Sequence, residues 1–296
     1  MTTTLDSDLS ARASWARRQA AIAAAAPAQR GVILAAEARA GRQDIIRTIG
    51  HARLGHIGGD LSVIDVLTTL YNGVLRVALD DPEWPGRDRL ILSKGHCACA
   101  LYVTLARTGF ISRDDLSGFA ADLSPLNGHP SRGKVPGVEF STGPLGHGLS
   151  EAVGVALGTK LQAGSSRVYV VLGDGELQEG SNWEAAMAAA QYGLANLVAT
   201  VDRNRLQQGA RTEETNHLEP LAAKWAAFGW KVIEADGHDH GQLLTAYRSE
   251  PDGRPTVVIA HTVKGKGVSF MEDRVEWHHK VPTEDQVNQA LAELAQ

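Results

Sequence analysis

Two polar residues stand where two apolar runs of the chain end, and their types suit a divalent cation. Asp174 lies between glycines in "VVLGDGELQEG", directly after one apolar run. Asn204 ends the next run, "LVATVDRN", 30 residues later, and one strand–helix–strand crossover fits in that interval. Carboxylate and amide oxygens are hard ligands that suit Mg²⁺, which in turn holds a diphosphate. The pattern predicts such a site at the carboxyl ends of two neighbouring strands.

A second stretch, "STGPLGHGLS", has a backbone suited to lying against a ligand. Gly143, Pro144, Gly146 and Gly148 fall within six residues of it. Glycine lacks the side chain that would keep a ligand away from the backbone. We therefore expect a tight turn against a bound molecule. His147 stands between two of these glycines, and both a ligand contact and an ordinary polar loop residue remain open for it.

The elements that must position these residues alternate between apolar runs and helical periodicity. We predict strands over 167–175, 197–204, 231–237 and 256–265. Helices are predicted over 43–54, 61–77, 96–109, 151–164, 181–194, 217–229 and 282–296. The alternation indicates an α/β fold, a doubly wound and mainly parallel sheet with helices on both faces.

Local signals suggest where four of these helices begin or end. Ser181 and Asp60 are expected to be N-caps of the helices that follow them. Thr283 and Gln286 have capping-box spacing, and Gly109 is expected to end the helix before it. For Asp60 a second interpretation stays open, in which its charge lies beside the ligand and shifts the specificity for it.

Bulk composition is that of an ordinary globular protein. The 296 residues are 43% hydrophobic and 21% charged, and the net charge of −5 gives no reason to expect nucleic acid or an anionic membrane as partner. Residues 1–30 are expected to form a leader, partly disordered or helical, and residues 31–296 the main domain. The leader does not read as a secretory signal, so we expect a cytoplasmic protein. Cys97 and Cys99 have C-x-C spacing and are interpreted as small core residues.

Six motifs occur in the order in which transketolases carry them. They are "GHIGGDLS", "LSKGHCACALY", "NGHPS", "STGPLGHG", "GDGELQEG" and "KGKGVSFMEDRVEWHHK". Between about residues 40 and 285 the chain resembles transketolases, and Gly-Asp-Gly with the later Asn resembles the thiamine diphosphate motif. The resemblance implies the thiamine diphosphate-binding fold with thiamine diphosphate and Mg²⁺ as cofactors. It also implies the N-terminal, diphosphate-binding subunit of a split transketolase, which transfers a two-carbon ketol unit between sugar phosphates.

The same resemblance implies roles for individual residues. His56 would contact substrate hydroxyls and assist proton transfer, His129 would contact the bound intermediate, and His278 would lie between cofactor and substrate. The metal would be held by Asp174, Asn204 and the backbone carbonyl of Leu206. The cofactor contacts would be His96, Gly143, Pro144, Leu145, Gly175, Glu179, Asn204, Lys264 and His278.

Some of these positions carry a second interpretation or depart from the family. Glu179 is either a contact between cofactor domains or a solvated acid at a helix start. Arg203 stands before Asn204, where the thiamine motif often has Asn. The remaining histidines, His279, His238 and His240 among them, are interpreted as surface or structural residues.

The expectation of a partner subunit depends on one glutamate that these motifs do not include. Thiamine diphosphate needs a glutamate beside its pyrimidine ring, and the motifs of this chain include no counterpart. The resemblance therefore implies a partner, a C-terminal transketolase subunit with the pyrimidine-binding and C-terminal domains, in an α2β2 assembly. Three alternatives stay open: another thiamine diphosphate enzyme such as a 2-oxo acid dehydrogenase α subunit or a deoxyxylulose phosphate synthase, a non-catalytic scaffold subunit, and a transketolase for an unusual sugar.

Overall fold

A five-stranded, entirely parallel sheet forms the centre of the protein. The computed structural model describes residues 5–295. Its strands are β1 (Arg89–Leu92), β2 (Val168–Gly173), β3 (Leu197–Arg203), β4 (Lys231–Asp236) and β5 (Thr256–His261), in the spatial order β1-β2-β3-β5-β4. The predicted doubly wound α/β fold is confirmed, and the short edge strand β1 was not predicted.

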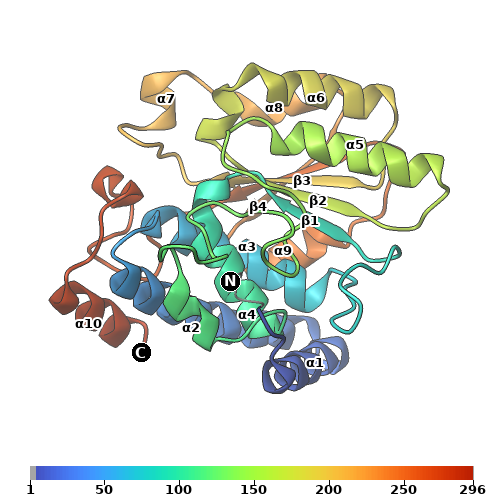
Figure 1. The fold of residues 1–296 in the computed structure, drawn as a ribbon. Coiled ribbons are helices and arrows are strands. Elements are labelled where there is room, and N and C mark those ends of the chain that lie inside the picture. The colour runs from blue at the N-terminus through green and yellow to red at the C-terminus, as the bar shows by residue number, and fades with distance from the viewer. Residues whose placement is uncertain (1–4, 296) are drawn as a thin grey trace.

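Helices cover both faces of the sheet (Figure 1). One face carries α5 (Gly148–Leu161), α6 (Gly180–Gln191) and α8 (Leu221–Ala227), and α7 (Thr212–Thr215) lies nearby. The other face carries α2 (Pro27–Ala52), α3 (Ile57–Gly73), α4 (Ala98–Thr108) and α9 (His240–Tyr247), with α1 (Leu9–Ala24) and α10 (Glu284–Glu293) outside them.

The side chains of β2 point alternately to the two faces of the sheet, which shows why helices must pack on both faces. Tyr169 and Val171 pack into the core shared with α2, α3 and α4. Val168, Val170 and Leu172 pack into the core shared with α5, α6 and α8. Successive side chains of a strand point to opposite faces, so an uninterrupted apolar strand is stable only between two layers of helices.

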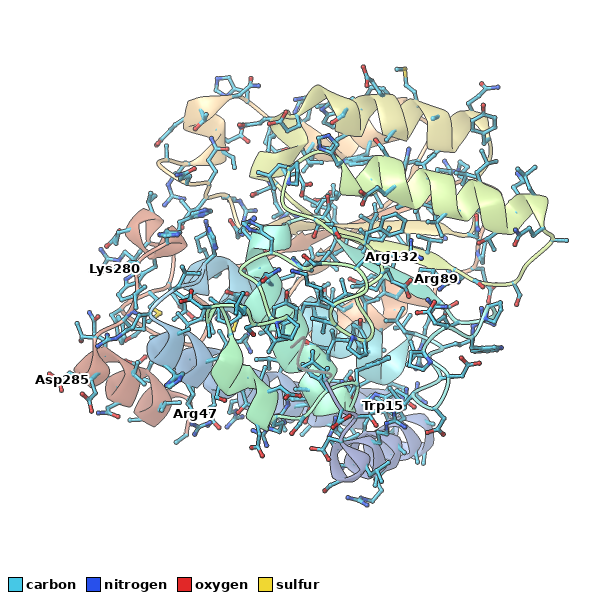
Figure 2. All side chains as sticks on the ribbon, in the orientation of Figure 1. Trp15, Arg47, Arg89, Arg132, Lys280 and Asp285 are labelled. Atoms are coloured by element: carbon cyan, nitrogen blue, oxygen red, sulfur yellow. The ribbon has the colours of Figure 1, made fainter. Side chains whose placement is uncertain are left out.

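The N-terminal residues fold onto the rest of the chain. α1 is helical from Leu9, where Asp8 accepts hydrogen bonds from two backbone amides as its N-cap. Trp15 is buried where α1 meets the neighbouring helices, and its indole N–H donates to the carbonyl of Tyr71 at 3.0 Å (Figure 2). The division expected near residue 30 falls within α2, which runs unbroken from Pro27 to Ala52.

The start of α3 differs from the prediction. The helix begins at Ile57 with His56 as N-cap, so Asp60 lies inside its first turn and the expected Asp60 N-cap is wrong. Two glycines enter the helix because the packing there leaves no room for side chains. A Cβ on Gly58 would come within 2.7 Å of the Trp277 carbonyl oxygen, and one on Gly59 within 2.8 Å of Cys97 Sγ.

The other cap predictions have different outcomes. Thr283 and Gln286 form the predicted capping box of α10, and Gly109 ends α4 with φ of 91°. Ser181 is not the N-cap of α6, because that position belongs to Glu179. Instead, the Ser181 hydroxyl donates to the carbonyl of Gly146 at 2.8 Å and so ties α6 to the glycine-rich turn.

Two other sequence expectations concern the core and membranes. Cys97 and Cys99 are both free and buried, as predicted. None of the helices within residues 5–295 has the length and apolar character needed to cross a membrane.

Candidate functional site

A cavity of about 580 Å³ lies at the carboxyl ends of β2 and β3. Every residue predicted for the site lines it except Pro144, whose side chain is exposed beside it. The walls come from distant parts of the chain. They include His56, Lys94, His96, His129, Gly143, Leu145, Asp174, Gly175, Glu179, Asn204, Leu206, Lys264 and His278.

The predicted metal ligands meet as the parallel strand ends require. Asp174 follows β2 and Asn204 follows β3, and both side chains are buried. One carboxylate oxygen of Asp174 accepts from the Gly175 amide at 2.8 Å, and the other from the Arg205 amide at 2.6 Å. Asn204 Oδ1 accepts from the Leu206 amide at 3.1 Å. Carboxylate, amide and backbone carbonyl oxygens from these residues make a donor set that fits Mg²⁺.

Arg203 also contacts the predicted metal ligand. Its guanidinium lies 3.2 Å from Asp174 Oδ2, and it donates to Thr212 Oγ1 at 2.7 Å. Two further ion pairs join it to Glu213 and Glu219 at 2.9 and 2.8 Å. The departure from the usual Asn before Asn204 thus leaves the ligand position intact and adds a buried cation behind it.

Four other histidine rings surround that of His56. Their centroids lie 5.2 Å away for His96, 6.3 Å for His129, 5.4 Å for His278 and 4.8 Å for His279. His56 precedes α3, His96 lies in the short helix η1 (Gly95–Cys97) and His278 in η4 (Val275–His278). All but His279 were predicted for the site. His279, interpreted as surface or structural, is exposed but adjoins the same group.

The rings of His56, His96, His129 and His278 are neutral near pH 7. Burial, with smaller effects from nearby histidines and lysines, lowers the pKa of His56 to about 4. Burial and the neighbouring Lys264 lower the pKa of His278 to about 3. Burial also lowers the pKa of His96 and of His129. A neutral imidazole has one N–H donor and one acceptor nitrogen, so the group can both donate to and accept from sugar hydroxyls.

Two lysines supply positive charge to the cavity. Lys264 is buried, and burial together with Lys94 lowers its pKa to about 8. Lys94 forms a buried ion pair with Asp202, which raises its pKa although burial opposes the charge. At pH 7 both ammonium groups are protonated, which suits an anionic ligand such as a diphosphate.

The glycine-rich turn lies against the cavity as expected. Gly143 has φ of 158°, and a Cβ there would come within 3.3 Å of the His129 ring. Gly146 has φ of 87°, and a Cβ there would come within 2.6 Å of Ser181 Oγ. His147 is exposed, with its ring nitrogen Nδ1 3.2 Å from the Leu145 carbonyl oxygen.

Two buried acids of the site were missed. Asp202 precedes the Arg203–Asn204 pair and accepts from Lys94, Ser62 and Thr262. Glu176 directly follows Gly-Asp-Gly and lines the cavity. Burial raises its pKa, although the three hydrogen bonds that it accepts act to lower the pKa. The sequence shows that both acids lie beside the thiamine diphosphate motif. It does not show their hydrogen-bond partners, most of which are far away along the chain.

Three polar side chains of interest lie outside the cavity wall. Asp60 is fully buried, and burial raises its pKa to about 8. One of its oxygens accepts from the Ala100 amide at 2.8 Å. His238 and His240 both contact Asp65, at 2.6 and 3.3 Å, which agrees with a structural role. The position of Asp60, outside the cavity wall, gives no support to the interpretation in which its charge shifts the specificity for the sugar.

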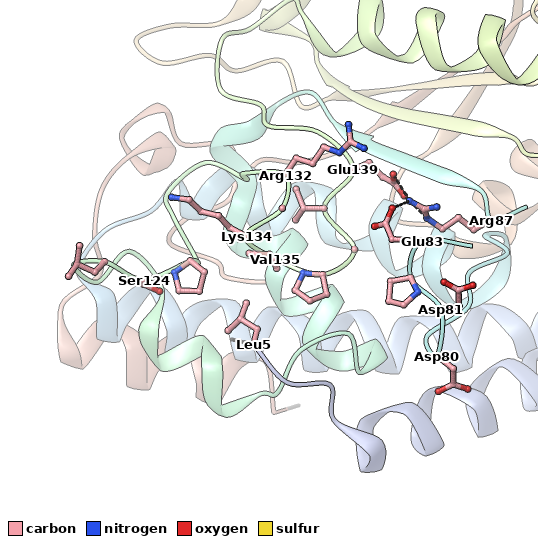
Figure 3. Close-up of a pocket in the computed structure, with 17 residues that line it drawn as sticks. Leu5, Asp80, Asp81, Glu83, Arg87, Ser124, Arg132, Lys134, Val135 and Glu139 are labelled. Carbon is pink, nitrogen blue, oxygen red and sulfur yellow. Dashed lines mark hydrogen bonds and ion pairs between the residues drawn. The ribbon is translucent and has the colours of Figure 1, made fainter. Parts of the chain in front are cut away.

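A larger cavity, of about 690 Å³, lies elsewhere on the molecule (Figure 3). It is lined by Leu5 and by residues of the segments 80–87 and 123–139. On one side of it Arg87 and Glu139 form a two-bond ion pair, at 3.1 Å for each contact. These two polar groups are thus paired with one another, whereas the cavity at the strand ends presents the predicted metal ligands and the group of histidines.

Comparison with known proteins shows similarity to the transketolase family. The family model described as the thiamine diphosphate binding domain of transketolase matches residues 34–295. The chain is 48% identical over 257 residues to a subunit of the apulose-4-phosphate transketolase of Phocaeicola vulgatus, covering 86% of this chain and 91% of that protein. It is 39% identical to the 6-deoxy-6-sulfo-D-fructose transketolase subunit SqwG of a Clostridium species, over 86% of this chain and 93% of the relative.

Full-length transketolases match over part of their length. Human transketolase is 38% identical over 241 residues, which are 81% of this chain and 38% of the human protein. A crystal structure of the Pichia stipitis enzyme in complex with sedoheptulose 7-phosphate superimposes with a TM-score of 0.83 at 28% identity, covering 88% of this chain and 41% of that one.

Proposed function

The chain belongs to the transketolase family, as its thiamine diphosphate-binding domain, and we propose that it works as the cofactor-holding subunit of a two-chain transketolase. In this proposal it transfers a two-carbon ketol unit from a ketose phosphate to an aldose phosphate. The observation that carries the proposal is that Asp174, Asn204 and the four predicted histidines meet in one cavity.

The metal site is part of the proposal. Asp174, Asn204 and the Leu206 carbonyl would hold Mg²⁺, and Lys264 would neutralise the diphosphate that the metal binds. When bound, thiamine diphosphate supplies the carbon centre at which the carbon–carbon bond breaks and forms. Gly143, Leu145 and Gly175 leave the backbone open to the cofactor, with Pro144 in the same turn, and Glu179 lies exposed at the start of α6.

The histidines orient the sugar and carry protons. His56 and His129, both neutral at pH 7, present a donor and an acceptor nitrogen to sugar hydroxyls. His278 lies between these rings and the diphosphate side, where its Nδ1 accepts from Lys264 and its Nε2 is left to bind a ligand. His96 stands next to His278, with ring centroids 5.5 Å apart, and would contact the diphosphate.

A partner chain completes the proposed enzyme. Several relatives of similar length are named as single subunits of a transketolase, and full-length transketolases extend well beyond the matched region. We assign to the partner the glutamate that contacts the pyrimidine ring, and we propose an α2β2 assembly in the cytoplasm. The chain alone is expected to be inactive because part of its site comes from this interface.

A second candidate concerns the sugar. Identity to two apulose-4-phosphate transketolase subunits is 48% and 49%, against 38% to human transketolase. This difference favours a donor outside the common pentose phosphates. Pocket shape and hydrogen-bonding groups set such a preference, and part of the pocket belongs to the partner.

The test is ketol transfer with thiamine diphosphate and Mg²⁺, on this chain alone and mixed with the protein encoded next to it. Xylulose 5-phosphate and apulose 4-phosphate serve as parallel donors to ribose 5-phosphate. Activity in the mixture only is the expected result, and the better donor identifies the sugar. Cofactor binding without transfer from either donor would overturn the substrate assignment, and turnover of 2-oxo acids would move the protein to another class of thiamine enzyme.

A further inference from the structure

A buried carboxylate joins three separate segments of the site. Glu176 is 2% exposed and follows Gly175 in the short helix η3 (Gly175–Gln178). Its Oε2 accepts from the Gly173 amide at 2.9 Å. Its Oε1 accepts from the Gly146 amide at 3.0 Å and from the Ser93 hydroxyl.

Each of these donors is the immediate neighbour of a residue on the cavity wall. Ser93 precedes Lys94, Gly146 follows Leu145, and Gly173 precedes Asp174. The three segments come from the end of β1, the glycine-rich turn and the end of β2. One side chain therefore sets where the lysine, the turn and the metal ligand stand relative to one another.

The surrounding contacts hold Glu176 itself in place. The Ser93 hydroxyl also accepts from the Gly148 amide at 3.2 Å, at the start of α5. The Glu176 carbonyl accepts from the side-chain amide of Asn182 at 2.7 Å, in α6. Glu176 is thus held by α5 through Ser93 and by α6 through its own carbonyl, and it has little freedom to follow a displaced segment.

We propose that Glu176 is a positioning residue that sets the affinity for thiamine diphosphate by holding these three segments in register. The proposal rests on the proposed function, since it takes the cavity to be the cofactor site. Glu176 contacts the neighbours of the cofactor-binding residues and acts through them. A carboxylate suits this place because its two oxygens accept hydrogen bonds from all three of these groups.

Glu176→Gln is the sharpest variant because it keeps the shape and changes only the hydrogen bonding. An amide has one acceptor oxygen, so its NH₂ must face either the Gly173 amide or the Gly146 amide, and that backbone N–H then loses its acceptor. Partners of this kind behind a metal or cofactor site typically change affinity about 10- to 100-fold. Ser93→Ala removes one of the three bonds, and we expect a smaller loss of affinity. Glu250→Gln, at an exposed site, is the matched control.

The experiment is calorimetric titration of thiamine diphosphate, at saturating Mg²⁺, into the chain purified with its partner. For Glu176→Gln we expect the Kd to rise about 10- to 100-fold, and the KM for thiamine diphosphate to rise with it. The KM for the ketose should stay unchanged. The melting temperature of each variant is measured without cofactor, so that a loss of folded protein is not counted as a loss of affinity.

The outcomes separate this inference from the proposed function. Failure of the wild-type assembly to bind thiamine diphosphate would overturn the proposed function. Binding by the wild type with the same Kd for a folded Glu176→Gln variant would overturn only the positioning role. If Glu176→Gln does not fold, Ser93→Ala decides, and a Kd equal to that of Glu250→Gln would reject the inference.

Discussion

Lys264 Nζ lies 2.9 Å from His278 Nδ1, and with Lys264 protonated this contact fixes the tautomer of His278. An ammonium group can only donate, so Nδ1 accepts and the ring proton resides on Nε2. Lys264 follows β5 and His278 lies in η4, so the contact also joins two segments of the cavity wall. His278 therefore presents a donor, in a defined direction, to a ligand in the cavity.

The lowered pKa of His278 makes stability depend on pH. Its pKa is about 3 in the folded chain against 6.5 in its ordinary state, so between these values the unfolded chain binds more protons. Stability is then lost as the pH falls below about 6.5. We expect the melting temperature of His278→Gln to fall less steeply than that of the wild type between about pH 7 and 4.5. His217→Gln, at an exposed histidine, is the control. Equal slopes in all three proteins would contradict the pKa assignment.

Substitution of His56 should affect turnover more than cofactor binding. His56→Asn keeps a residue type that suits the N-cap of α3 but removes the imidazole. We expect kcat to fall about 100-fold or more, because the proposed proton-transfer group is lost. The Kd for thiamine diphosphate should stay within about twofold.

His279→Asn is the matched control for His56, since its ring lies 4.8 Å from that of His56 but on the exposed side. Steady-state kinetics of the assembled enzyme check both variants. A larger loss in His279→Asn than in His56→Asn would mean that the proton transfer is assigned to the wrong histidine.

Cofactor binding should require both a divalent cation and Asp174. Protein treated with EDTA is expected to lose thiamine diphosphate binding and to regain it with Mg²⁺. Asp174→Asn keeps one acceptor oxygen but turns an NH₂ toward the Arg205 or Gly175 amide, so we expect binding to weaken about 100-fold. Asp252→Asn, at an exposed loop, should bind as the wild type does. Tight binding by Asp174→Asn in EDTA would remove the metal site from the proposal.

Gly146 should tolerate no side chain. Gly146→Ala places a Cβ 2.6 Å from Ser181 Oγ and 2.7 Å from Glu179 Cβ, at φ of 87°. We expect a loss of about 1–3 kcal/mol of folding stability together with weaker cofactor binding. Gly133→Ala has a similar φ of 80°, but nothing lies within 4 Å of its Cβ, so it shares only the backbone strain. Chemical denaturation of both variants isolates the effect of the clash. Equal losses would show that the tight contact at Gly146 is unimportant.

Much of the site could be predicted from local sequence. Asp174 and Asn204 could be paired because each directly ends an apolar strand, and parallel neighbours bring their carboxyl ends to one edge. Thr283 and Gln286 could be assigned to a capping box because the two groups involved lie within one helical turn. In each case the deciding interaction depends on spacing along the chain or on a regular element.

Tertiary structure alone decided the contacts that span the chain. Asp60 could not be excluded as an N-cap until Gly58 and Gly59 were seen packed against Trp277 and Cys97. Glu176 meets Gly146 across 30 residues and Ser93 across 83, and no periodicity or motif encodes such partners. Sequence by itself thus determined the strand ends and their ligand types. Only close packing in three dimensions decided which buried polar groups meet, because a buried donor or acceptor is paired by whatever the fold brings within reach.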